Sequence, residues 1–236
     1  MILRSLTKHV KDQNWFAVLI DFTIVVIGVF IGIQVANWNE LRAQEQRDIV
    51  LLERLFGDFE QIAEWGERRY PLHVETAEHT RRLIEAIRND VEPPLDNSTR
   101  DWLEASVEVY ASFESSPTYD ELVATGTLSR IRHAGLRQAL NAYAREREAD
   151  MVLLNQQLQM RDTGPIESAV RFRANSERYG DVLIADSFDW PRLKSTEPHL
   201  QKVLRTQVLR NRWHRQELAS AREILSIIND SLGSDQ

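Results

Sequence analysis

The residues best suited to hold a metal ion or to transfer a proton are 6 histidines and 36 carboxylates. Two His/Glu pairs have helical spacing: Glu75 and His79 are four residues apart, and His214 and Glu217 are three apart. Neither pair belongs to an HExxH motif, and no Glu-x-x-His pair of the di-iron bundle type occurs. His73 falls on an apolar helical stripe and is predicted to lie in the core. Because isolated pairs are frequent by chance, we predict no metal site and no other cofactor.

Nucleophilic catalysis has no recognisable motif either. The chain has no cysteine, which excludes a thiolate nucleophile, and it contains no G-x-S-x-G, P-loop or dinucleotide-binding glycine pattern. The neighbouring carboxylates Asp58/Glu60 and Asp120/Glu121 fall on predicted helices and are expected to be solvated. We therefore predict that the protein is not an enzyme. Titratable side chains buried together in one pocket would favour an enzyme, whereas an apolar surface groove would favour binding.

One basic cluster interrupts an acidic chain of formal net charge −7. It surrounds two predicted helix breaks at Gly126 and Gly135, and a basic turn between helix ends can hold an acidic partner segment. The alternative is that these side chains pair with acids of their own fold. The cluster consists of Arg130, Arg132, His133 and Arg137, and we expect the three arginines to point outward. The negative net charge argues against a nucleic-acid partner.

These candidate residues belong to a chain that begins with a long apolar segment. Residues 15–38 contain a single charge, Asp21, and have a tryptophan at each end. At about 1.5 Å per helical residue the segment spans roughly 35 Å, enough to cross a bilayer. Tryptophan rings favour the headgroup zone. We predict a transmembrane helix over residues 15–38.

Small residues and the one charge share a face of this helix. Gly28 and Gly32 form a GxxxG pattern, Ala36 extends it, and Asp21 lies on nearly the same face. Small residues let two helices approach closely, and a polar group on the seam can bond to the partner helix. The predicted partner is a second copy of the chain or another membrane protein. The alternative is that Asp21 reaches the headgroups and the glycines have no role.

The segment before the apolar run suggests its orientation. Residues 1–14 carry three basic side chains and one acid, as an uncleaved signal anchor would. The apolar run is longer than that of a signal peptide and ends in Asn37-Trp38-Asn39, a poor cleavage site. We predict a single-pass protein of the inner (cytoplasmic) membrane. Residues 1–14 would be cytoplasmic, and residues 39–236 would form an extracytoplasmic domain.

The remaining residues have helical periodicity, which predicts an all-α fold. An apolar stripe runs from Leu52 to Ile87, and Pro71 inside it should kink the helix or divide it in two. The apolar run is expected to continue into this helix through residues 37–47. The sequence thus predicts a transmembrane helix that leads into a bundle of long amphipathic helices.

Further helices follow from capping residues and apolar spacing. Capping boxes at Ser98 and Thr118 start two of them. The first should continue to Phe113 before Pro117, and Gly126 ends the second. A long helix should end at Gly164, another should run from Pro165 to Gly180, and the last should cover residues 196–232. Residues 181–195 are predicted to be a loop. No segment has the alternation of a strand.

Two segments resemble a bacterial family of membrane-anchored proteins. They read DFTIVVIGVFIGIQVANWNE (residues 21–40) and TYDELVATGTLSRIRHAGLRQALNAY (residues 118–143). The resemblance implies one N-terminal span followed by a helical domain of unknown function, and it implies no activity, cofactor or catalytic residue. We therefore expect a membrane-anchored interaction or scaffold module that associates through its span. The alternatives are a component of an envelope sensing complex and an enzyme with an unrecognised helical active site.

Overall fold

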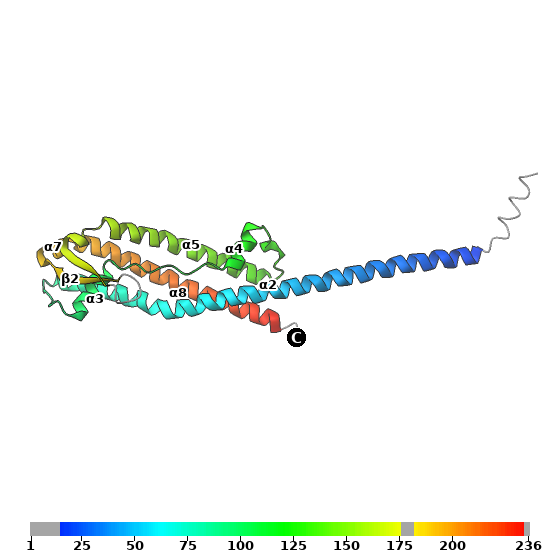
Figure 1. Cartoon of the computed structure of the whole chain (residues 1–236), viewed down its shortest axis with the longest axis horizontal. Coiled ribbons are helices and arrows are strands. Elements are labelled where there is room, and N and C mark those ends of the chain that lie inside the picture. The colour runs from blue at the N-terminus through cyan, green and yellow to red at the C-terminus, as the bar shows by residue number, and fades with distance from the viewer. Residues whose placement is uncertain (1–14, 176–181, 234–236) are drawn as a thin grey trace, which may run out of the picture. The chain divides into compact units, whose positions relative to one another are not determined.

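The computed structural model describes residues 15–175 and 182–233 (Figure 1), so the predicted head, residues 1–14, lies outside the described residues. In chain order the elements are α2 (Trp15–Arg88), α3 (Asn97–Ala105), α4 (Pro117–Ala124), η1 (Leu128–Arg130), α5 (Ala134–Thr163), α6 (Ile166–Ala169), β1 (Val170–Asn175), β2 (Val182–Phe188), α7 (Trp190–Ser195) and α8 (Glu197–Gly233). The fold is mostly helical, as predicted. Internal contacts divide the chain into two compact units between Leu51 and Leu52.

Helix α2 contains the whole apolar run and continues through residues 37–47, as the sequence predicts. It also passes through Pro71 without interruption, so the alternative of two separate helices is wrong. Proline removes one backbone donor and crowds the preceding turn. Pro71 lies on the exposed side of the helix, where water can bond to the carbonyl that loses its partner.

Three long helical segments form the bundle of the second unit: the part of α2 after Leu52, α5 and α8. The ring of Phe59 on α2 meets Tyr143 on α5 edge to face, with centroids 5.1 Å apart. Asn211 on α8 donates a hydrogen bond to the carbonyl of His73 on α2 at 3.1 Å, and α5 packs along α8 (Figure 1). The predicted amphipathic bundle is therefore confirmed.

Helix α3 is shorter than the sequence predicts. Its N-cap is Asp96, whose carboxylate accepts a hydrogen bond from the first turn at 2.9 Å, so the Ser98 capping box is wrong. The expected continuation toward Phe113 is also wrong, because residues 108–116 form neither helix nor strand. Their carbonyls instead accept hydrogen bonds from side chains of α5 and α8. Tertiary hydrogen bonds thus replace the helical ones.

Helix α2 and this irregular segment approach each other closely at Gly66. A Cβ atom placed on Gly66 would collide with the ring of Phe113. Phe113 is almost fully buried, and its ring also meets Trp65 edge to face with centroids 5.3 Å apart. A residue without a side chain therefore lets the segment lie against the bundle.

The predicted ends of α4 and α5 agree with the structure. Gly126 follows α4 with a φ of 67°, the left-handed conformation that favours glycine, and α5 ends at Gly164. The predicted start of α4 is slightly too late in the chain. The N-cap is Ser116 and not Thr118, and Pro117 occupies the first turn.

A two-stranded antiparallel sheet is the largest departure from the prediction. The expected helix is wrong over residues 170–175 and the expected loop is wrong over residues 182–195, because β1 pairs with β2 and α7 follows. Residues 176–181 lie outside the described residues. The side chains of β1 do alternate: Val170 is buried, Arg171 exposed, and Phe172 half-buried. The hairpin docks on α3, and the apolar cluster beneath it includes Leu83, Leu103, Val170, Trp190 and Leu193.

Candidate functional site: a buried ionisable cluster

The predicted basic cluster divides into two exposed arginines and two residues that stabilise a turn. Arg130 and Arg132 are exposed, as expected. His133 caps α5, its Nδ1 accepting a hydrogen bond from the backbone N–H of Leu136 at 3.0 Å. Arg137 is half-buried and donates to the carbonyls of Ile131 and Arg132. The expectation that Arg137 points outward is therefore wrong, because its guanidinium closes the turn before α5.

The predicted seam residues of the apolar helix are all exposed: Asp21, Gly28, Gly32 and Ala36. A Cβ atom added to either glycine would meet nothing within 4 Å. Within the described residues, one helix is long and apolar enough to cross a membrane, and none of its apolar window is buried. That length and composition fit a membrane anchor and equally fit a secretory signal sequence.

Asp58 does not face solvent as predicted. Its Oδ2 atom accepts hydrogen bonds from the hydroxyl of Ser116 at 2.7 Å and from the backbone N–H of Thr118 at 2.9 Å. The carboxylate therefore binds the first turn of α4 and links that helix to α2. Helix N-termini favour negative charge, so this contact is structural.

The chemically richest site in the described residues is a cluster that the sequence analysis did not assemble. It consists of Asp150 on α5 and of Arg210, His214 and Glu217 on α8, and we call it the buried cluster. All four side chains are at most 2% exposed. The three α8 residues share one face because they are spaced four and three apart. The His214/Glu217 pair was visible in the sequence, whereas Asp150 is 64 residues away from His214.

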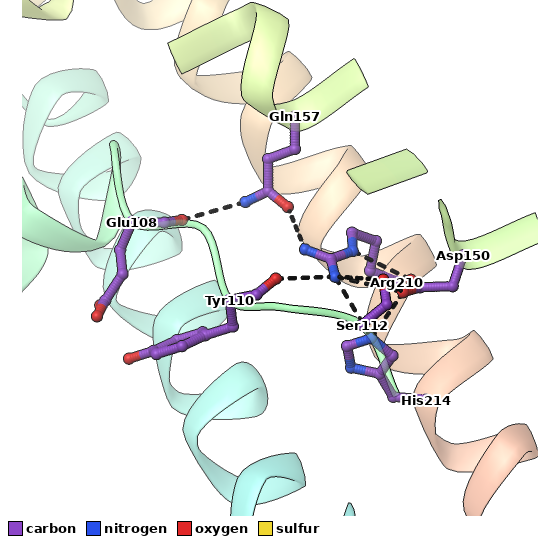
Figure 2. Close-up of polar contacts among 7 residues, drawn as sticks. All are labelled: Glu108, Tyr110, Ser112, Asp150, Gln157, Arg210 and His214. Atoms are coloured by element: carbon purple, nitrogen blue, oxygen red, sulfur yellow. Dashed lines mark hydrogen bonds and ion pairs between the residues drawn. The ribbon is translucent and has the colours of Figure 1, made fainter. Parts of the chain in front are cut away.

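Arg210 is bonded on every side by the chain itself (Figure 2). Its Nε donates to Asp150 Oδ1 at 3.0 Å and its Nη1 to Gln157 Oε1 at 2.9 Å. Its Nη2 donates to the carbonyl of Tyr110 at 3.0 Å, with Ser112 and Asp150 also in reach. The guanidinium thus ties the irregular segment 108–116 to α5 and α8. Recognition of an external anion would require breaking these bonds.

Asp150 remains ionised at the centre of this network. It accepts hydrogen bonds from Arg210, from the hydroxyl of Ser112 and from His214 Nε2, the last at 3.0 Å. Burial by itself would raise the pKa of Asp150, but the hydrogen bonds and charges of His214 and Arg210 outweigh burial and hold that pKa well below its usual value.

Glu217 has no such partners. Neither oxygen of its carboxyl group has a hydrogen-bond partner among the described residues, and the side chain is 0% exposed. Burial, reinforced by the negative charges of Asp150 and Glu146, raises the pKa of Glu217 to about 8. Without a partner the side chain is therefore held as the neutral acid at pH 7.

Two buried histidines lie next to each other, and one of them, His214, belongs to the buried cluster. The rings of His73 and His214 meet edge to face with centroids 4.1 Å apart. One nitrogen of each ring, His73 Nε2 and His214 Nδ1, has no hydrogen-bond partner in the described part of the chain. Burial, followed by the charges of His214 and Arg210, lowers the pKa of His73 to about 3, so this imidazole is neutral.

The buried cluster also brings together atoms that ligate metals. Asp150, His214 and Glu217 each offer one ligand atom, and these three atoms lie within 4.8 Å of one another. Carboxylate and imidazole groups are common ligands of zinc, iron and manganese. The predicted pair Glu75/His79 is different: its atoms are 3.9 Å apart and the glutamate is exposed.

A small polar pocket lies on one side of the buried cluster. Its cavity volume is about 10 Å³, and His73, Tyr110, Gln157 and Arg210 are among its lining residues. A cavity of about 10–15 Å³ is needed to hold one water molecule, so this pocket has room for about one water molecule or one small ion. Of the buried cluster, Arg210 lines the pocket, whereas Asp150, His214 and Glu217 do not.

Comparison with protein-family models, with curated proteins and with solved structures found no significant match. The resemblance of residues 21–40 and 118–143 to a membrane-anchored family therefore depends on those two segments alone. What the structure does show of that resemblance is a long apolar helix near the N-terminus, followed by a helical domain.

Proposed function

We propose that this protein is a membrane-anchored helical interaction module, with residues 15–38 in the inner membrane and the helical domain on the extracytoplasmic side. The observation that carries the proposal is the apolar window of α2, of which 0% is buried inside the molecule. A helix with apolar side chains all round needs an apolar surrounding. The lipid bilayer supplies that surrounding along the full length of the segment.

An uncleaved anchor fits α2 better than a signal sequence does. Residues 37–47 continue the same helix without a break. Signal peptides end in small residues at the cleavage site, whereas Asn37, Trp38 and Asn39 occupy this position. The basic head supports a cytoplasmic N-terminus, because basic residues are enriched on the cytoplasmic side.

A binding role is also supported by the state of the buried cluster. Its titratable groups are buried close together, and titratable side chains buried together in one pocket would favour an enzyme. However, Asp150, His214 and Glu217 are 0% exposed and do not line the pocket, so no substrate can touch them in this conformation. Arg210 lines the pocket but its donors are occupied. The alternative of a helical enzyme is therefore the weaker one.

The partners we propose follow from two surfaces. The seam of Asp21, Gly28, Gly32 and Ala36 would contact a second copy of the span or another membrane protein. Arg130 and Arg132, both exposed, would contact an acidic segment of a partner, as in an envelope sensing complex.

A variant with both arginines replaced, Arg130→Ala/Arg132→Ala, tests this contact. The variant should no longer be captured by an immobilised acidic peptide, while its thermal unfolding stays unchanged.

Membrane extraction combined with an intact-mass measurement tests the anchor. The full-length protein should remain in membranes washed with alkaline carbonate, and detergent should release it with the mass of the uncleaved chain. A protein that is released by carbonate, or that has lost the residues before Asn39, would overturn the proposal.

A further inference from the structure

We propose that Asp150, His214 and Glu217 form a binding site for one divalent transition-metal ion of the zinc class. The proposal goes beyond the membrane-anchored module and does not depend on it. It rests on the convergence of three buried ligand atoms within 4.8 Å of one another.

The first argument is the unpartnered carboxyl group of Glu217. Both of its oxygens are buried and lack a hydrogen-bond partner among the described residues. Leaving polar atoms unpaired in a protein interior is costly, and such atoms are rare in folded proteins. Glu217 lies beside Asp150 and His214, so a cation between the three side chains would provide the missing partner.

The second argument is the charge of the interior. Among the described residues with buried side chains, the acids are Glu146, Asp150 and Glu217, and the only arginine or lysine is Arg210. Binding of a metal would require Glu217 to lose its proton, and the three carboxylates and one guanidinium would then carry a formal excess of two negative charges. A bound dication neutralises that excess, whereas a monovalent ion would leave part of it in place.

The third argument is that the ligands are already held in position. Asp150 is fixed by Arg210 and Ser112, and the ring of His214 is packed between His73 and Phe113 at centroid distances of 4.1 and 5.3 Å. Supporting contacts of this kind orient ligands in metal sites. A set of one imidazole and two carboxylates, with no thiolate, suits zinc, iron or manganese.

Metal analysis of the full-length protein in detergent tests the site. The protein would be treated with a chelator, dialysed against Zn²⁺, and assayed for bound zinc and for thermal unfolding with and without the metal. Wild type should bind about one zinc per chain and unfold at a higher temperature with zinc. Glu217→Gln, which preserves the shape of the neutral acid, should lose both effects. Glu223→Gln, an exposed substitution on the same helix, should lose neither.

The alternative is that Glu217 is simply a buried neutral acid. In that case Glu217→Gln would bind as much zinc as wild type, or neither protein would bind any, and either result would overturn the proposal. A Co²⁺-loaded sample gives an independent measurement, because Co²⁺ in a site of nitrogen and oxygen ligands absorbs visible light. That absorption should be present in wild type and in His79→Gln, a control for adventitious binding at the Glu75/His79 pair. It should be absent in Glu217→Gln.

Discussion

At the scale of single residues, the fold of the second unit depends on Arg210. Replacing Arg210 with Met should destabilise the protein by about 3–5 kcal/mol, because Asp150 would remain buried with its main cationic partner removed. Urea unfolding of the metal-free protein measures this difference. Arg222→Ala is the matched control on the same helix: its ion pair with Glu67 is exposed and should contribute less than about 1 kcal/mol. Equal losses in the two variants would contradict the structural role of Arg210.

His73 should make the protein sensitive to acid. Its pKa of about 3 in the folded state lies below the ordinary 6.5, so between these values the unfolded chain binds the proton more readily. Stability contributed by the neutral imidazole is thus complete above about pH 6.5 and is lost as the pH falls toward 3. His73→Gln cannot titrate and should lose less stability than wild type between pH 7 and pH 4.5. Urea unfolding in the presence of a chelator measures this, and equal losses would show that His73 does not contribute.

Whether a residue could be predicted from the sequence depended on how local its contacts are. His214 and Glu217 could be paired because they lie on one face of one helix, and His73 was correctly placed in the core. The contact of Asp150 with His214 spans 64 residues and leaves no trace in local spacing. The roles of His133 and Arg137 were missed for a different reason. Histidine and arginine are the residue types of a basic surface, and the same types can cap a helix or close a turn.

At the scale of elements, the close approach at Gly66 determines where the irregular segment lies. Gly66→Ala should destabilise the protein by about 1–3 kcal/mol, because the added methyl group collides with the ring of Phe113. Thermal or urea unfolding measures the loss. A second substitution, Phe113→Leu, should make the Gly66→Ala change less harmful than it is in the wild-type background. If the two changes were simply additive, the collision would not be the cause.

Helices were predictable where their stop signals are local, and the hairpin was not. Gly126 and Gly164 end α4 and α5 as expected, since a glycine after a helix acts within a few residues. The strand β1 does alternate apolar and polar residues, but over only six positions, and so short a run does not distinguish a strand from part of a helix. The helix predicted to continue into residues 108–116 does not form there, because carbonyls of this segment accept hydrogen bonds from side chains of α5 and α8. No local sequence pattern reveals these contacts.

At the scale of the whole molecule, the exposed glycines of α2 predict association through the membrane span. Gly32→Ile should markedly reduce self-association of residues 15–38 in a membrane reporter assay, because a larger side chain prevents close helix approach. Phe30→Ile is the matched control, since Phe30 lies on the far side of the helix from Gly28 and Gly32 and should leave the signal unchanged. An undiminished signal in Gly32→Ile would mean that the glycines do not form the contact.

The location and activity of alkaline phosphatase fused to the C-terminus test both the anchoring and the orientation of the chain. Alkaline phosphatase is active only outside the cytoplasm, and an uncleaved anchor keeps it in the membrane fraction. With an uncleaved anchor and an extracytoplasmic domain, the fusion should be active and should sediment with membranes. An inactive fusion would contradict the proposed orientation, and an active fusion released into the soluble periplasmic fraction would show that α2 begins in a cleaved signal sequence.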